Sequence, residues 1–402
     1  MTSTEDSTSG ALTSGWLGLI SSSATAVVVG FASTILLIME AARAVGANPA
    51  EQGSWAAALC YGMALTTLIL SWRYKMPIIT AWSTPGAAVI ATSGAGIGYA
   101  NALGAFVVAG LLVCLAALLT PIARLIERIP APVAAAMLAG VLVRYCLGVP
   151  GAALAMPVIV IGLSIVFFAL RLSYPLFAVP VVVGLGIVAA MIAGQFGSEC
   201  CSFGVTPLVW TTPQFDASAI LGLGVPLFLV TMASQNLPGF AVLRAAGYRP
   251  PVTASFWVTG IGSVLAAPFG SHALNLAAIT ASIVTGPDCH PDPKRRWLVA
   301  WPYLAMYGVV GLLAGSLIQI LGSLPPALIT AIVGLALFAP LAGSATAMMK
   351  EPRDIESAIL TFLVTASGVT IAGVGSAFWG LVAGLILFVA RHYIHGWRRT
   401  QL

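Results

Sequence analysis

The chain has 402 residues, of which 59% are hydrophobic and only 7% are charged, whereas charged residues make up about 25% of an average soluble protein. This composition excludes a water-soluble globular protein and predicts a polytopic membrane protein with almost no chain left for an extramembrane domain. The formal net charge of +5 is carried mostly by short loops between apolar runs, where it indicates membrane topology and not binding to nucleic acid.

Taken in chain order, the apolar runs predict an all-α membrane protein. Residues 1–14 are polar and rich in Ser and Thr, and we expect a short disordered tail there. Runs bounded by Pro, Gly or charged residues follow, and most of them are long enough for a full transmembrane helix. These predicted helices cover residues 16–40, 53–72, 99–120, 131–147, 153–171, 175–194, 218–242, 250–267, 297–320, 326–348, 355–372 and 375–395.

Two shorter runs, 77–93 and 268–284, fall third and tenth in this order, and each begins at a Pro. Each is too short to cross a bilayer as one regular helix, which needs about 20 apolar residues, and each carries hydroxyl or imidazole groups. Irregular backbone at membrane depth is tolerated only where protein covers it or where it lines a cavity. A matched pair of interrupted segments therefore indicates the substrate site of a secondary transporter.

With these two segments the chain is predicted to cross the membrane fourteen times, with both termini in the cytoplasm. All lysines and arginines except Arg43 and Arg144 then fall on the cytoplasmic side, as the positive-inside rule requires. Similar segments also recur in the same order in the two halves, which predicts two inverted repeats of seven spans. The matching pairs are Arg43–Gly46 with Arg244–Gly247, Pro77 with Pro268, and Pro132–Gly140 with Pro326–Gly334. The predicted repeats cover residues 15–195 and 217–397, with an extracellular loop at 196–216 and a C-terminal tail at 398–402.

A helix that begins inside the membrane directs unpaired N–H groups and the positive end of its dipole at the cavity. We expect such helix starts at Thr84 and at Ser271, with Ser83, Thr84 and Ser271 as capping residues. Two helix starts that face each other would form a site for an anion or for the polar edge of a ring.

His272 is the only histidine inside an apolar stretch, and an ionisable residue in a membrane span is a functional candidate by default. Its imidazole titrates near physiological pH, so His272 is the candidate for carrying a coupled proton. The alternative is a neutral histidine that only donates a hydrogen bond. Asn275 follows about one turn later and would face the same site.

Gln235 and Asn236 lie in the middle of the eighth predicted span. Two adjacent amides there are costly unless they are paired, and Pro238, two residues later, frees backbone carbonyls at the same depth. We expect both amides to line the cavity, and the alternative is hydrogen bonding between packed helices. Trp82 and Phe269, in the two broken segments, are candidates to stack on a planar substrate.

Several long motifs of the chain are distinctive. They are Thr80–Ala88 (TAWSTPGAA), Leu229–Asn236 (LVTMASQN) with Pro238–Gly239, Ala278–Ala281 (AITA), His290–Asp292 (HPD), and Leu363–Gly368 (LVTASG) with Gly375–Gly380 (GSAFWG). Together they resemble the motifs of the bacterial benzoate/proton symporter (BenE) family, and the resemblance covers almost the whole chain after the polar tail.

The resemblance implies proton-coupled uptake of benzoate by alternating access across the cytoplasmic (inner) membrane of a bacterium. It implies the seven-plus-seven inverted-repeat fold shared with uracil and other nucleobase transporters and with bicarbonate and sulfate carriers. In that fold a core of spans 1–4 and 8–11 moves against a gate of spans 5–7 and 12–14, and relatives are commonly homodimers. Nucleobase relatives carry carboxylates where this chain has Gln235 and, within about one turn, His272, and this departure suits an anionic substrate such as benzoate.

The predicted function is therefore symport of benzoate, or a similar aromatic carboxylate, with protons. The candidate substrate-binding residues are Trp82, Ser83, Thr84, Gln235, Asn236, Phe269, His272 and Asn275. The alternatives are a nucleobase or inorganic-anion transporter on the same fold, or a passive anion channel. No nucleotide-binding motif, catalytic triad or metal-ligand cluster is visible in the sequence, so we predict neither an enzyme nor a bound cofactor or metal.

Overall fold

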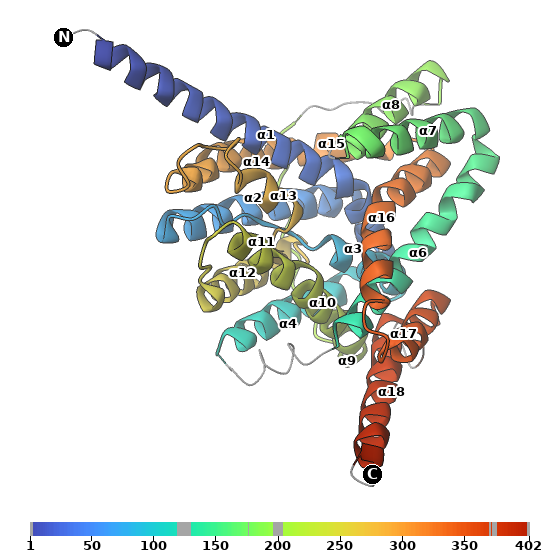
Figure 1. The fold of residues 1–402 in the computed structure, drawn as a ribbon. Helices are drawn as coiled ribbons and strands as arrows, with labels where there is room; N and C mark the ends of the chain where they lie inside the picture. Colours follow the sequence, from blue (N-terminus) through green and yellow to red (C-terminus); the bar gives the residue numbers. More distant parts are fainter. Residues whose placement is uncertain are drawn as a thin grey trace.

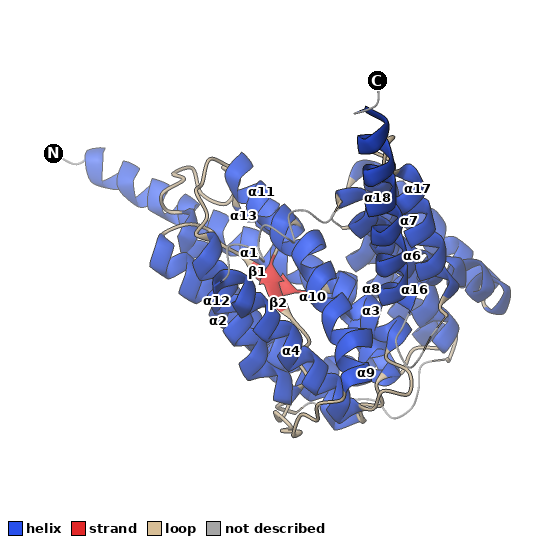
Figure 2. Ribbon diagram, turned by 90° about the horizontal axis from the view of Figure 1, so that it is seen from below, coloured by secondary structure: helices blue, strands red, loops and turns tan. Residues whose placement is uncertain are grey.

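The computed structural model of the protein describes residues 3–118, 130–175, 177–195, 204–369, 371 and 376–399. Most of these residues are helical, and the helices pack around one short two-stranded sheet (Figures 1 and 2). The first half contains α1 (Ser3–Ala44), α2 (Pro49–Tyr74), β1 (Thr80–Trp82), α3 (Thr84–Ser93), α4 (Tyr99–Leu118), α6 (Ala131–Ala155), α7 (Pro157–Ser173) and α8 (Ala178–Ile192).

The second half begins with a long helix that changes its winding twice. It contains α9 (Ala217–Ala219), the π-helix η1 (Ile220–Gly224), α10 (Val225–Thr231), the π-helix η2 (Met232–Asn236) and α11 (Leu237–Ala245). The elements that follow are α12 (Val252–Ala266), η3 (Ala267–Phe269), β2 (Leu274–Leu276), α13 (Ile279–Val284), η4 (Arg296–Val299), α14 (Ala300–Leu312), α15 (Ala314–Gly322), α16 (Pro326–Met348), α17 (Ile355–Ser367) and α18 (Ser376–Arg399).

The helical, multi-pass character of the chain agrees with the prediction, whereas the count of fourteen spans is not confirmed. Within the described residues, seven helices are long and apolar enough to cross a membrane, or eight if the pair Arg296–Leu312 and Ala314–Gly322, bent by 58°, is one span. Other apolar runs form shorter helices, among them α7, α8 and α17. Hydropathy detects apolar runs, but Pro and Gly residues inside or beside a run shorten and bend the helix that it forms.

At the N-terminus, α1 begins at Ser3. The disordered tail expected at residues 1–14 stays a prediction.

The first broken segment is built by residues that stop one helix and start another. Helix α2 ends at Tyr74, and the next residue, Lys75, caps it in a left-handed conformation with φ of 53°. Pro77 then keeps the chain extended into β1. Helix α3 then begins at Thr84, as predicted, with Pro85 in its first turn and the Ser83 hydroxyl as the N-terminal cap.

The second broken segment starts from a tight turn. Gly270 has a φ of +105°, and a Cβ there would lie 2.7 Å from the Cβ of Trp55, so only glycine fits between the turn and α2. The chain continues as extended backbone through His272 to β2, and helix α13 begins only at Ile279. The helix start predicted at Ser271 is wrong, because Leu274–Leu276 pair as a strand before the helix can begin.

The two broken segments lie against each other in the middle of the molecule (Figure 2). Strands β1 and β2 pair antiparallel, with Thr80 opposite Leu276 and Trp82 opposite Leu274, and the N–H of Ala277 donates to the carbonyl of Ile79. Segments separated by about half the chain thus satisfy each other's backbone groups, which lipid could not do.

Figure 2 also shows two groups of helices. One surrounds the paired strands and includes α1, α2, α4 and α10 to α13, and the other contains α6, α7, α8, α16, α17 and α18. Residues 204–216 form an extended chain, in which Thr206 and Thr211 hydrogen-bond to the backbone of α14 and of the η3 turn. The predicted movement of a core against a gate concerns these two groups and stays a prediction.

The hydrogen bonds of the Thr80 hydroxyl test which interactions stabilise the first broken segment. This buried hydroxyl lies 2.7 Å and 2.8 Å from the hydroxyls of Thr66 and Thr67, and it donates to the carbonyl of Met63. The substitution Thr80→Val keeps the shape and removes these bonds, and we expect a loss of about 1–3 kcal/mol of stability, measured by thermal unfolding in detergent. Thr346→Val is the control, because that hydroxyl bonds an exposed carbonyl in its own helix. Equal effects of the two substitutions would contradict the account.

Candidate functional site

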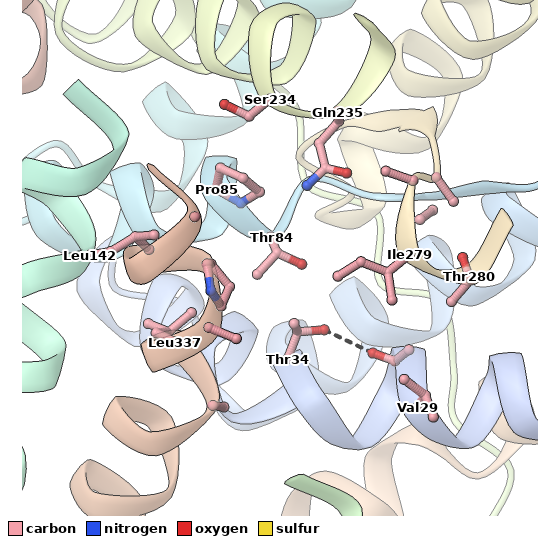
Figure 3. A pocket seen from close by; sticks show the side chains of 18 of the residues that line it. Val29, Thr34, Thr84, Pro85, Leu142, Ser234, Gln235, Ile279, Thr280 and Leu337 are labelled. Atoms are coloured by element: carbon pink, nitrogen blue, oxygen red, sulfur yellow. Dashed lines mark hydrogen bonds between the residues drawn. The ribbon is translucent and has the colours of Figure 1, made fainter. Parts of the chain in front are cut away.

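A cavity of about 470 Å³ lies between the two helix groups, beside the paired strands (Figure 3). Its walls come from the broken segments, the middle of α1, the π-helix η2, and helices α6, α8 and α16. The lining residues are Val29, Gly30, Thr34, Ala81, Trp82, Thr84, Pro85, Leu138, Leu142, Pro175, Val179, Ser234, Gln235, Ala277, Ala278, Ile279, Thr280, Ala336, Leu337, Ala339, Pro340, Gly343 and Ser344.

Trp82 forms a rigid part of the wall. Its indole N–H donates to the hydroxyl of Thr34 at 2.6 Å, and that hydroxyl donates to the carbonyl of Gly30 at 2.9 Å (Figure 3). The rings of Phe31 and Tyr307 pack against the indole, with centroids 6.0 Å and 6.3 Å away. The indole is therefore held in one orientation. A fixed indole offers a planar ligand a flat surface on which to stack.

Gln235 reaches the cavity because of the local winding of its helix. Residues Met232–Asn236 form one turn of π-helix, a feature that often marks functional sites because it turns side chains away from the regular helical positions. The side chains of Ser234 and Gln235 line the cavity (Figure 3). Asn236 is fully buried instead, and its side-chain oxygen accepts from the N–H of Leu276 at 2.9 Å. One predicted amide thus faces the cavity and the other holds β2.

The N-terminus of α3 keeps most of its N–H groups for itself. Pro85 has none, the N–H of Gly86 donates to the Ser83 hydroxyl at 3.0 Å, and the N–H of Ala87 donates to the Ser83 carbonyl at 2.8 Å. The expectation that this helix start presents a row of unpaired N–H groups is therefore wrong. The side chain of Thr84 remains as a polar group at the cavity wall.

His272 lies behind the cavity wall, fully buried, and has a partner on each ring nitrogen. The Trp55 indole N–H donates to Nδ1 at 3.1 Å, and Nε2 lies 2.9 Å from the carbonyl oxygen of Ser83. Because an indole nitrogen only donates, Nδ1 must accept, so Nε2 carries the hydrogen and the ring is neutral. This geometry favours the interpretation that His272 fixes the two broken segments to each other, and its role in proton coupling stays a prediction.

Of the remaining predicted residues, Asn275 is buried behind the cavity lining and Phe269 lies away from the cavity. With its amide oriented to satisfy both neighbours, Asn275 accepts from the N–H of Ser83 and donates to the carbonyl of Leu276, each at 2.9 Å. Phe269 packs against Trp210, with ring centroids 5.4 Å apart, and does not line the cavity. Of the predicted substrate-binding residues, the structure brings Trp82, Thr84 and Gln235 to the cavity, whereas Ser83, Asn236, His272 and Asn275 form the buried layer behind it.

Sequence reasoning missed Thr280 as an individual site residue. Its side chain is only 6% exposed, lines the cavity, and its hydroxyl has no hydrogen-bond partner among the described residues. A buried hydroxyl without a partner is costly, and this one belongs to a residue of the cavity wall. The signal was present in the sequence, because Thr280 lies in the second broken segment at the start of its short helix.

The opposite wall of the cavity was also missed. It comes from apolar residues of α6 and α16, including Leu138, Leu142 and Leu337, which are ordinary helix-packing residues in the sequence. One hint was Pro340, which lies inside α16 and lines the cavity together with Gly343, since Pro and Gly bend membrane helices and open space beside them.

The paired broken segments and the cavity beside them define a membrane transporter, and solved structures agree on the fold. The transmembrane domain of the cyanobacterial bicarbonate transporter BicA is 16% identical in sequence and matches with a TM-score of 0.62, over 92% of this chain and 97% of that one. The murine anion transporter Slc26a9 in an inward-facing state is 12% identical and matches with a TM-score of 0.62, over 94% of this chain and 68% of that one.

Sequence comparison identifies the family. The "Inner membrane protein YdcO" of Escherichia coli is 38% identical over 369 residues, which are 92% of this chain and 94% of the relative. The "Benzoate membrane transport protein" of Acinetobacter baylyi is 30% identical over 363 residues, 90% of this chain and 92% of the relative. Residues 17–390 match the profile of the benzoate membrane transport protein family, BenE. The chain is a member of the BenE family of membrane transporters, as the motif resemblance predicted.

The role of His272 is tested by two substitutions. His272→Leu leaves the Trp55 N–H and the Ser83 carbonyl without buried partners, and we expect it to cost about 1–3 kcal/mol of stability in thermal unfolding. His272→Gln can still donate and accept, so we expect a smaller loss and retained uptake driven by a proton gradient in proteoliposomes. A His272→Gln protein that folds and binds substrate but no longer responds to the gradient would instead assign the coupled proton to this residue.

Proposed function

We propose that the protein takes up benzoate or a similar aromatic carboxylate together with protons, by alternating access of the cavity between its two helix groups. The observation that carries this proposal is the cavity itself, which combines a rigid indole and apolar helix surfaces with a few polar side chains. Its volume of about 470 Å³ lies within the range of small-molecule sites, about 300–1,000 Å³.

The distribution of groups around the cavity suits an aromatic acid. Leu138, Leu142 and Leu337 lie on the side of α6 and α16, where they would contact an apolar ring. Gln235, Thr84 and Thr280 lie on the side of the broken segments, where they would bind a carboxyl group (Figure 3). A ring and a single polar end would thus be recognised by opposite walls.

The position of the cavity supports alternating access. Because its walls belong to two separate helix groups, a relative movement of the groups would change which side of the membrane reaches the ligand. The name of the Acinetobacter baylyi relative, a benzoate membrane transport protein, supports the choice of substrate. A cytoplasmic location of both termini and assembly as a homodimer are further parts of this proposal.

The direct test is uptake by purified protein in proteoliposomes. We expect saturable accumulation of labelled benzoate that rises with an inward proton gradient and collapses when an ionophore removes the gradient. Uptake that only equilibrates benzoate would indicate a passive channel. Competition by uracil, xanthine or sulfate, without competition by substituted benzoates, would favour a nucleobase or inorganic-anion transporter.

Gly343 allows the cavity to be filled without disturbing the fold. A Cβ at this position would meet no heavy atom within 4 Å, and the residue lines the cavity. We expect Gly343→Leu to occupy ligand space and weaken benzoate binding by roughly tenfold or more, equal to about 1.4 kcal/mol, in isothermal titration calorimetry. The matched control is Gly184→Leu on α8, because a Cβ there is equally free of contacts but lies outside the cavity lining. Equal binding by both variants would place the substrate elsewhere.

A further inference from the structure

Among the described residues that line the cavity, none has an ionisable side chain. All its polar side chains are hydroxyls, one amide and one indole, contributed by Thr34, Thr84, Ser234, Gln235, Thr280, Ser344 and Trp82. A carboxylate that enters a site of low polarity loses its hydration, and this cost is large unless a cation or several N–H donors replace the water. The chemistry of the walls therefore decides whether the ligand's carboxyl group binds as a neutral acid or as an anion.

The titratable groups nearest the cavity are held in other contacts. His272 is neutral and bonded on both ring nitrogens. The Tyr303 hydroxyl donates to the carbonyl of Thr80 at 2.9 Å, and Tyr307 packs edge-to-face against the Trp82 indole. The Tyr145 hydroxyl lies 3.5 Å from the carbonyl of Ala88. None of these four side chains lines the cavity.

The charged groups on the surrounding helices are also engaged elsewhere. On α1, Glu40 and Arg43 form an ion pair at 3.2 Å. On α6, the Arg144 guanidinium lies beside Gly368, at the end of α17, and on α7 the Arg171 guanidinium lies over the ring of Phe338. On α11, Arg244 is in the last turn. The described parts of α3, α8, α13 and α16 contain no Asp, Glu, Lys, Arg or His.

The helix start of α3 keeps most of its N–H groups for its own capping. Its Gly86 and Ala87 N–H groups are consumed by Ser83, and Pro85 offers none. The polar side chains that remain for a carboxyl group on this wall are the Gln235 amide and the hydroxyls of Thr84 and Thr280. A hydroxyl can donate one hydrogen bond and also accept, and the amide has two N–H donors and an acceptor oxygen.

An amide and a protonated carboxyl group are complementary, since each has one acceptor oxygen and one donor side by side. The carboxyl O–H would donate to Gln235 Oε1, and the Gln235 NH₂ would donate to the carboxyl C=O. A carboxylate has only acceptors, so it could accept from the Gln235 NH₂ but would leave Gln235 Oε1 without a donor. The walls of this site therefore fit the acid better than its anion.

We propose that the carboxyl group occupies the cavity in its protonated, uncharged form, so that the substrate itself carries the coupled proton, and that primary aromatic carboxamides are a second class of ligand. This inference rests on the proposed function, because it assigns the ligand to the same cavity. One proton from the outer solution joins one benzoate before the site closes, and both leave together on the inner side, where the acid ionises. No protein group changes its protonation state in this cycle.

The test compares benzoate with benzamide, whose carboxamide has the same donor and acceptor arrangement but does not ionise. Binding to the purified protein is measured by isothermal titration calorimetry over a series of pH values above the pKa of benzoic acid. We expect benzamide to bind with a Kd that does not change with pH. We expect the apparent Kd of benzoate to rise roughly tenfold for each unit of pH, because the fraction of protonated acid falls by that factor.

Two variants assign the binding to the amide. Gln235→Leu should weaken benzoate and benzamide together, whereas Gln319→Leu, an exposed change on α15, should leave both unchanged. The comparison of benzoate with benzamide on the wild-type protein tests the proposal even if the Gln235→Leu variant does not fold. Benzoate binding without benzamide binding would overturn recognition of the neutral form and leave the proposed function intact. Binding of neither ligand at any pH would overturn both.

Discussion

The antiparallel pairing of β1 with β2 is the interaction on which the rest of the site depends. A span that is interrupted inside the membrane leaves backbone N–H and C=O groups with no water to bond them, so each broken segment alone would be unstable there. The N–H of Ala277 donates to the carbonyl of Ile79 across the pair, and the outward-facing backbone groups of Thr80, Leu274 and Leu276 bond side chains of the surrounding helices. The pairing brings together residues separated by about half the chain, and it fixes the position at which each segment meets the cavity.

The polar residues of this region divide into a layer that holds the backbone and a layer that faces the cavity. Asn236, Asn275 and His272 are fully buried, and each bonds backbone groups of the broken segments. Their neighbours Gln235 and Thr280 line the open space. The inner layer explains how irregular backbone is stable at this depth, and it leaves the outer layer free to bind a ligand.

Much of this arrangement could be predicted from the sequence, for identifiable reasons. The Pro residues that begin both broken segments and the polar groups within them are local signals, so the segments and the start of α3 at Thr84 were found. Which of two adjacent amides faces the cavity depends on the π-helical turn at Met232–Asn236, which hydropathy does not reveal. The start of α13 at Ile279 depends on strand pairing across the chain, and the wall formed by α16 depends on tertiary packing of ordinary apolar residues.

The central claim is that an aromatic acid binds between the broken segments and α16. Its most direct test is a structure of the protein bound to para-iodobenzoate, with the iodine located by its anomalous scattering. We expect the iodine beside Leu337 and Pro340 and the carboxyl group beside Gln235. An iodine bound outside the cavity, with the cavity empty at saturating ligand, would contradict it.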